Sequence, residues 1–179
     1  MTDETIMEAV RDGDLEQVAV LFERYHKRIF NFLARMAFNR EIAEDLTHDV
    51  FIRIIRYRNS FREGSRFTPW IYQIARNVYA DHYEVQKKKY GNTIDVEKVM
   101  DVIPDVDESN AMEEKEELLH RSMALLTDEQ RELLVLTRFQ HLRYEEVATI
   151  LDTTVANVKV KVHRAIGKLR EHYFELAKA

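Results

Sequence analysis

The chain has 179 residues and a formal net charge of −5, with four Gly, two Pro and no Cys. So few turn-forming residues leave little room for a β-protein, and the lack of thiols excludes disulfides and thiolate zinc sites. No apolar run approaches the roughly 18 residues of a membrane span and the N-terminus is acidic rather than signal-like, so we expect a cytoplasmic protein with no direct membrane insertion.

The first third of the chain predicts three helices. Thr2 or Asp3 can cap a short one, and Asp14 is the expected start of a longer one, with Gln17 placed to complete a capping box. Asn39 is the expected N-cap of a third helix, whose outer surface is acidic at first and then basic. The inward stripe of this third helix is expected at Ala43, Leu46, Val50 and Ile54.

A loop over residues 59–68, with Gly64 at its middle, precedes a fourth predicted helix. Thr68 and Pro69 are a strong helix start, because Pro at the first position lacks only an N–H that would be unpaired there. The buried positions of this helix are expected at Ile71, Ile74, Ala75, Val78 and either Tyr79 or His82. Its other sides carry Trp70, Tyr72, Gln73, Arg76, Asn77 and Tyr83.

This helix and its loop are rich in aromatic, amide and basic groups. Such groups suit unpaired nucleic acid, because rings stack on bases, amides read base edges and cations hold the backbone. The alternative is that Phe61, Phe67, Trp70 and Tyr79 are simply core, and the pattern alone leaves both interpretations open.

Charge divides the chain into segments. Residues 53–90 hold nine Lys or Arg against three Asp or Glu, whereas residues 91–126 hold three against ten. Residues 91–112 also lose the helical periodicity and gain Gly91 and Pro104. They are interpreted as a flexible acidic linker between a domain at 1–90 and a second domain at 113–179. The predicted fold is therefore all-α, with two small helical domains.

The second domain ends in a predicted helix-turn-helix. Thr127 is the expected cap of the helix before it, and Glu145 and Glu146 fit the first turn of a short helix. After the break at 152–154, Thr154 can cap a helix whose apolar stripe is Val155, Val158, Val162, Ile166 and Leu169. Residues 153–170 carry five Lys or Arg and no Asp or Glu.

A short turn followed by a capped basic helix favours duplex DNA binding through the major groove. The alternative is an ordinary helical hairpin with a solvated basic face.

Three motifs in order resemble the extracytoplasmic-function (ECF) sigma factors of bacterial RNA polymerase. AEDLTHDVFIRIIR (43–56) is similar to the helix that binds the polymerase clamp. FREGSRFTPWIYQIARNVYADHY (61–83) is similar to the element that melts and reads the minus-ten promoter region. LTDEQRELLVL (126–136), with the helix-turn-helix, is similar to the domain that binds the minus-thirty-five element. The resemblance covers residues 14–174.

The resemblance implies roles for named residues. Binding of core polymerase, through its β′ clamp and β subunit, would fall to Asp45, Asp49, Val50, Phe51, Arg53 and Ile54. Minus-ten DNA, unpaired and with a flipped-out base in the loop, would be bound by Gly64, Ser65, Arg66, Phe67, Trp70, Gln73, Arg76 and Asn77. Minus-thirty-five duplex would be bound by Thr154, Asn157, Lys159, Val160, Lys161, His163 and Arg164. A sigma factor implies no catalytic residue, cofactor or metal of its own, and proteins of this kind are often controlled by an anti-sigma factor.

The chain departs from the family pattern at four positions. His48 stands where Gln is most often found, Asp152 replaces the usual Gly of the turn, and Arg143 stands where a Ser or Thr cap is common. Val160 occupies a position that is often polar, so with His163 it makes the minus-thirty-five sequence preference unpredictable.

Two other functions fit parts of this pattern. A transcriptional regulator of the response-regulator effector kind would explain residues 127–174 but not the Trp70 helix. A carboxylate-bridged metal enzyme could use Asp45 with His48 and Glu117 with His120, but these pairs lie in different predicted domains.

Overall fold

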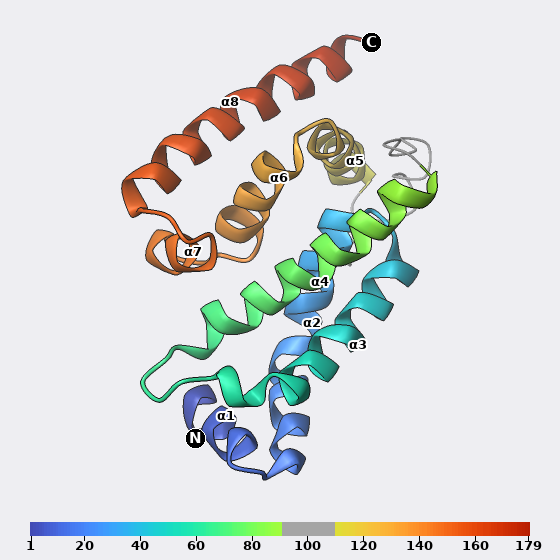
Figure 1. Ribbon diagram of the computed structural model, residues 1–179. Helices are drawn as coiled ribbons and strands as arrows, with labels where there is room; N and C mark the ends of the chain where they lie inside the picture. Colours follow the sequence, from blue (N-terminus) through green and yellow to red (C-terminus); the bar gives the residue numbers. More distant parts are fainter. Residues whose placement is uncertain (91–109) are drawn as a thin grey trace.

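The computed structural model describes residues 1–90 and 110–179, and its regular elements are all helical in these ranges, as predicted (Figure 1). The α-helices are α1 (Asp3–Arg11), α2 (Val18–Ala37), α3 (Arg40–Arg56), α4 (Phe67–Tyr90), α5 (Asn110–Ala124), α6 (Asp128–Leu134), α7 (Tyr144–Ile150) and α8 (Val155–Lys178). Short 3-10 segments occupy Leu15–Gln17 (η1) and Arg58–Ser60 (η2), and a π-helical turn, η4, occupies Val135–Phe139. Residues 91–109, most of the predicted linker, lie outside the described ranges, and α5 includes the last three residues of that linker, 110–112.

The first domain packs α1 to α4 around one apolar core, and its caps follow the sequence in two of three cases. Thr2 accepts a hydrogen bond from the Thr5 backbone N–H, and Asn39 accepts one from Ile42 at 3.0 Å. The predicted start of α2 at Asp14 is wrong: Asp14 makes no side-chain capping bond, and η1 precedes α2. The Asp14 carboxylate instead accepts a bond from the Gln17 side chain at 3.3 Å, so a turn rather than a capping box forms.

Helix α4 begins at Phe67, two residues before the predicted first position at Pro69, which falls within its first turn. Its buried stripe is as expected, and Tyr79, at 5% exposure, takes the position for which His82 was the alternative. Phe61, Phe67 and Tyr79 are all buried, so for these three aromatic residues the core interpretation is confirmed.

The second domain contains the predicted helix-turn-helix. Thr127 caps α6 in a full capping box with Gln130, and Thr154 caps α8 by accepting a hydrogen bond from Asn157 N–H at 3.1 Å. Between α7 and α8, Asp152 has φ of +52°, a left-handed conformation that Asp tolerates better than most residues that carry a Cβ.

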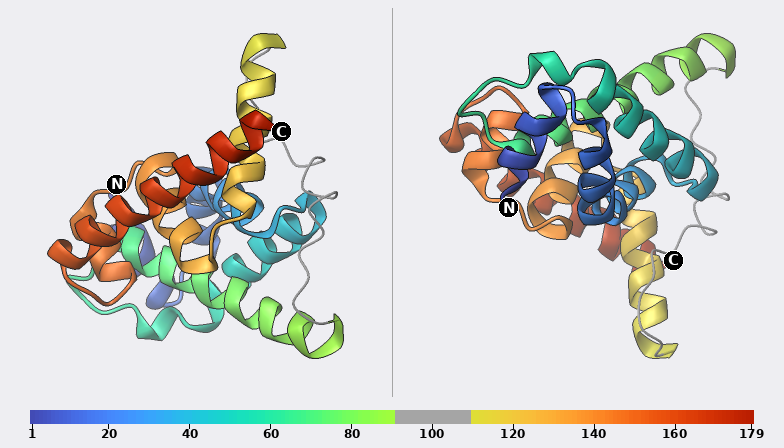
Figure 2. Two further views of the ribbon diagram at one scale, coloured as in Figure 1. Left: turned by 90° about the horizontal axis from the view of Figure 1, so that it is seen from above. Right: turned by 90° about the horizontal axis from the view of Figure 1, so that it is seen from below.

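The two domains lie against each other, with α4 beside α6 and α7 and with α8 on the outer side (Figures 1 and 2). Tyr72, which the helical pattern placed on an outer face of α4, is fully buried. Its ring packs edge-on against Phe32 of α2 with centroids 5.7 Å apart, and its hydroxyl donates to Gln140 Oε1 of the second domain at 2.6 Å. Among the described helices, none is both long and apolar enough to span a membrane.

Candidate polymerase and nucleic-acid interfaces

Helix α3 presents a mixed acidic and basic face to solvent. Asp45 and Asp49 are exposed, and the half-buried Arg53 pairs with Asp81 of α4 at 2.8 Å. Val50, Phe51 and Ile54 are in the first domain's core, with exposures of 0%, 6% and 0%. The prediction that these three apolar side chains face a polymerase is therefore corrected, because they already pack against α2 and α4.

The exposed apolar residue of this face is Ile52, which the sequence reasoning missed. It is 51% exposed and lies three residues after Asp49 on the same side of α3. The sequence could have indicated Ile52, because it is an apolar residue that lies outside the predicted inward stripe of this helix.

The loop between η2 and α4 exposes its central residues. Gly64 has φ of +80° and Ser65 N–H donates to Arg62 C=O at 3.1 Å, which makes a tight turn. Gly64 and Arg66 are exposed and Ser65 is half-buried, so these three of the predicted minus-ten residues are accessible. Phe67 is not: it has 0% exposure and packs edge-on against Tyr25 with ring centroids 5.0 Å apart.

The half-buried Trp70 joins the same aromatic group below the loop. Its ring lies 5.3 Å from Phe61 and 6.0 Å from Phe67, centroid to centroid. The loop therefore rests on buried rings while its tip faces solvent.

Further along α4, two of the three predicted minus-ten residues contact the second domain. Gln73 Nε2 donates to the Thr149 carbonyl at 3.0 Å. Arg76 Nε donates to Glu132 Oε1 at 2.8 Å, and its Nη1 donates to the Ile150 carbonyl at 3.3 Å. Asn77, one residue on, is exposed.

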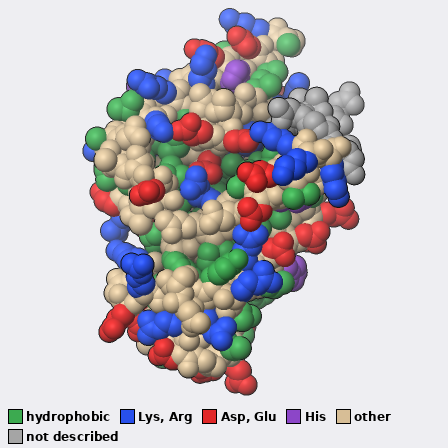
Figure 3. All heavy atoms as spheres, viewed as in Figure 1, with side chains coloured by type: hydrophobic (Ala, Val, Ile, Leu, Met, Phe, Trp, Pro, Cys, Tyr) green, Lys and Arg blue, Asp and Glu red, His purple; other side chains and the backbone are tan. Residues whose placement is uncertain are grey.

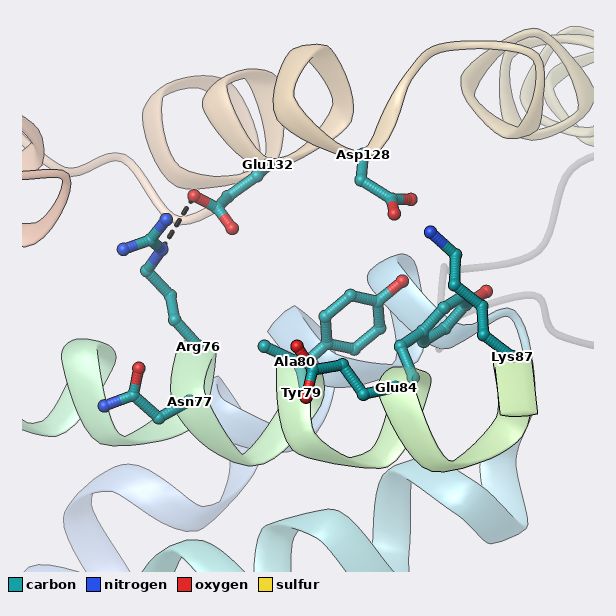
Figure 4. Close-up of a pocket in the computed structure, with 9 residues that line it drawn as sticks. Arg76, Asn77, Tyr79, Ala80, Glu84, Lys87, Asp128 and Glu132 are labelled. Atoms are coloured by element: carbon teal, nitrogen blue, oxygen red, sulfur yellow. Dashed lines mark hydrogen bonds and ion pairs between the residues drawn. The ribbon is translucent and has the colours of Figure 1, made fainter. Parts of the chain in front are cut away.

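A cavity of about 280 Å³ lies between α4 and α6 beside this ion pair (Figure 4). It is lined by Arg76, Asn77, Tyr79, Ala80, Tyr83, Glu84, Lys87, Asp128 and Glu132. Burial raises the pKa of Glu132 above its ordinary value, and the Arg76 guanidinium opposes this shift only in part. The carboxylate is therefore costly to bury even though it is paired.

Aromatic–cation contacts complete the interface between the domains. Arg131 of α6 has 0% exposure; its guanidinium lies 4.9 Å from the Phe38 ring centroid and donates to Asp128 at 2.6 Å. Arg35 of α2 lies 3.9 Å from the Phe139 ring centroid, and burial lowers the pKa of its guanidinium. Two arginines thus sit in low-polarity surroundings because one domain covers the other.

The predicted recognition helix α8 keeps its basic face in solvent. Lys159, His163 and Arg164 are exposed, and Val160, at 47% exposure, points almost directly away from the buried Val158. Thr154 is also exposed at the N-cap.

Two further residues of this set have partners within the domain. Lys161 is ion-paired with Glu129 of α6, and the Asn157 side chain donates to Thr153 Oγ1 at 2.7 Å. Lys161 therefore lies on the flank of α8 that faces α6, and Asn157 helps to shape the turn.

On the face of the molecule in Figure 3, basic and acidic side chains are interspersed, without one basic patch across both domains. Within the described ranges, no three His, Cys, Asp or Glu side chains are grouped so that they could hold a metal ion.

The structure combines a helical first domain, whose exposed loop lies over aromatic rings, with a second domain that contains a helix-turn-helix. Comparison with known proteins gives the family. Residues 21–89 match the model for sigma-70 region 2, and residues 116–169 match the model for sigma-70 region 4.

Curated relatives agree over nearly the whole chain. RNA polymerase sigma factor CarQ of Myxococcus xanthus is 32% identical over 172 residues, covering 95% of this chain and 97% of that protein. ECF RNA polymerase sigma factor SigM of Bacillus subtilis is 30% identical over 154 residues, covering 86% and 93%. The chain belongs to the sigma factors of bacterial RNA polymerase, in their ECF group. The region 2 match accounts for the Trp70 helix, which the response-regulator alternative left unexplained.

Solved structures share the fold. CnrH, determined in complex with the cytosolic domain of CnrY, superposes with a TM-score of 0.72 at 18% identity, covering 94% of this chain and 95% of that one. Sigma factor RpoE of Bartonella quintana, in complex with the anti-sigma factor NepR, gives 0.64 at 22% identity, covering 89% and 96%.

Proposed function

We propose that this protein binds core RNA polymerase and directs it to specific promoters, with the first domain opening the minus-ten region and the second docking on the minus-thirty-five duplex. The observation that carries the proposal is the pairing of an exposed, capped basic helix in one domain with an exposed loop over buried aromatic rings in the other. Catalysis would belong to the polymerase, with no catalytic residue in this chain. The protein would act in the cytoplasm, where the polymerase works.

Polymerase binding is assigned to the exposed face of α3. Asp45, Asp49 and Ile52 are accessible on this face, and a charged rim around an apolar side chain is typical of transient protein interfaces. The β′ clamp is the proposed partner there. The structural relative RpoE is bound to the anti-sigma factor NepR, which supports a further proposal, that an anti-sigma factor controls this chain.

Minus-ten recognition is assigned to the tip of the loop and to α4. Arg66 can hold a phosphate, the loop can accept a base once it is unpaired, and Asn77 can contact the same strand. Because Gln73 and Arg76 are bonded to the second domain, they can reach DNA only when the two domains separate. Polymerase binding would supply that separation.

Minus-thirty-five recognition is assigned to α8. Lys159 and Arg164 are placed for phosphates, and Val160 and His163 are central on the exposed face, where base edges are read. An apolar Val at this position favours contact with a thymine methyl group.

Run-off transcription with core polymerase and a library of promoter-like fragments tests the proposal. We expect specific initiation that depends on this protein, with both promoter elements recovered from the transcripts. Asn77→Ala should impair open-complex formation while leaving binding to the minus-thirty-five duplex intact. Arg164→Ala should weaken binding to that duplex without affecting the contacts to unpaired minus-ten DNA. If the protein neither binds the polymerase nor initiates transcription, the proposed function is wrong.

A further inference from the structure

Helix α1 precedes the region 2 match at residues 21–89, yet it contacts both ends of the loop assigned to minus-ten DNA. We propose that α1 is a brace that holds residues 62–66 in their DNA-reading conformation, with Glu4 and Arg11 as positioning residues. This inference rests on the proposed function, because it assumes that the loop reads promoter DNA.

Glu4 fixes the downstream end of the loop. Its Oε1 accepts a hydrogen bond from the Phe67 backbone N–H at 3.1 Å. Phe67 is the first residue of α4, where backbone N–H groups have no helical partner and the helix dipole favours a negative charge. A carboxylate from α1 therefore completes the N-terminus of α4, a task that is more often done by a residue next to the helix in sequence.

Arg11 holds the upstream end. Its Nη1 donates to the Phe61 carbonyl at 3.4 Å, and its Nε donates to Asp12 at 3.0 Å. Asp12 thus orients the guanidinium toward the loop. Both contacts of the brace are made to backbone atoms, so they restrain the path of the loop whatever side chains it carries.

The brace itself is firmly attached to the domain. Ile6, Met7 and Val10 of α1 are at most 1% exposed. Asp3 accepts a hydrogen bond from the Tyr25 hydroxyl and pairs with Arg24 at 2.7 Å. Because α1 is anchored to α2, it can transmit rigidity from the core to the loop.

The physical benefit is preorganisation. Loop residues 62–66 include an exposed turn with a left-handed glycine, which by itself would sample many conformations. A loop that is ordered before DNA arrives does not lose that freedom on binding, so more of the interaction energy is available to hold the unpaired strand.

The first test is hydrogen exchange on the full-length protein without DNA. In Glu4→Ala we expect the Phe67 amide and the loop amides to exchange about tenfold faster, as expected when one hydrogen bond that limits local opening is lost. Glu4→Gln keeps an acceptor oxygen and should restore most of the protection. Arg24→Ala is the matched control, because it removes a partly exposed ion pair of α1 and leaves both loop contacts and the buried Ile6, Met7 and Val10 in place.

The second test uses run-off transcription on a promoter selected by the wild-type protein. Glu4→Ala and Arg11→Ala should each lower open-complex formation about tenfold, while affinity for a minus-thirty-five duplex is unchanged and Glu4→Gln is close to wild type. Arg24→Ala should initiate normally.

These outcomes distinguish the restraint of the loop by α1 from the proposed promoter-recognition function. Unchanged exchange in Glu4→Ala overturns the brace. Faster exchange with normal open-complex formation overturns the positioning role. If the wild-type protein fails to initiate, the proposed function fails, and the exchange data still decide whether α1 restrains the loop.

Discussion

The contact between Arg76 and Glu132 allows a quantitative prediction about how the two domains hold together. Arg76 makes an ion pair at 2.8 Å and a backbone hydrogen bond at 3.3 Å across the interface. Its side chain is 34% exposed and that of Glu132 is 14% exposed, so the pair is neither fully solvated nor fully buried. Arg76→Ala should therefore shift the free protein toward separated domains.

The size of the shift follows from this intermediate burial. Exposed pairs contribute up to about 1 kcal/mol, and removing one partner of a buried pair costs about 3–5 kcal/mol. With solvent screening at Arg76 taken into account, we expect Arg76→Ala to cost about 2 kcal/mol and the coupling in a double-mutant cycle with Glu132→Ala to be about 1 kcal/mol. A loss of about 2 kcal/mol changes the equilibrium between joined and separated domains roughly 30-fold.

Energy transfer between two dyes measures this equilibrium. The chain has no cysteine, so Glu44→Cys in α3 and Arg170→Cys in α8, both at exposed positions, label each domain once. We expect transfer efficiency to fall in both single variants, and titration with urea would give the free-energy differences for the cycle.

The pair Lys168–Glu171 is the control, because both residues lie on α8 and are more than half exposed. A cycle on this pair should give coupling close to zero. Equal coupling for the two pairs, or unchanged transfer in Arg76→Ala, would refute the reasoning that the Arg76 contact holds the domains together.

Three further predictions concern the pH response of the domain contact, the core and the recognition helix. Because the pKa of Glu132 is raised in the joined state, joining of the domains is most favourable below the ordinary glutamate pKa and weakens as pH rises through the raised value. The efficiency of energy transfer between the two dyes should therefore fall as pH rises between 4 and 8. Glu132→Gln should remove this pH dependence. Phe38→Ala should lower the free energy of unfolding by about 3 kcal/mol in urea denaturation, since it removes a buried ring beneath a buried guanidinium; a loss below about 1 kcal/mol would contradict the observed packing. Lys159→Ala should reduce the salt dependence of minus-thirty-five binding by about one counterion. Lys161→Ala should reduce it less, because Lys161 is paired with Glu129, and equal effects would show that this ion pair breaks on DNA.

Sequence reasoning was most successful where the physics is local. The caps at Thr127 and Thr154 depend on residues three positions apart, and the stripe through Val158 and Val162 depends on the helical repeat. Such features are complete within one or two turns, so the helix-turn-helix and its exposed basic face were predictable. The failure at Asp14 has the same local origin, because a turn and a capping box compete for the same side chains.

The motifs also identified the family without any structure, because three of them occur in a fixed order. They could not say which motif residues are accessible. Val50 and Ile54 fit both the inward stripe and the clamp motif, and Phe67 fits both the loop motif and the core. Three-dimensional packing decided all three in favour of the core.

By itself, then, the sequence determined the helices, most of their caps, the division into two domains and the sigma family. Only the tertiary structure decided where a helix is also covered on a second face by a segment far away in the sequence. The Tyr72 hydroxyl bonds to Gln140 of the second domain, 68 positions away, and Glu4 caps a helix that begins 63 positions away. Helical periodicity specifies one buried face per helix. It carries no information about a distant segment that covers another face or supplies the side chain that caps the helix.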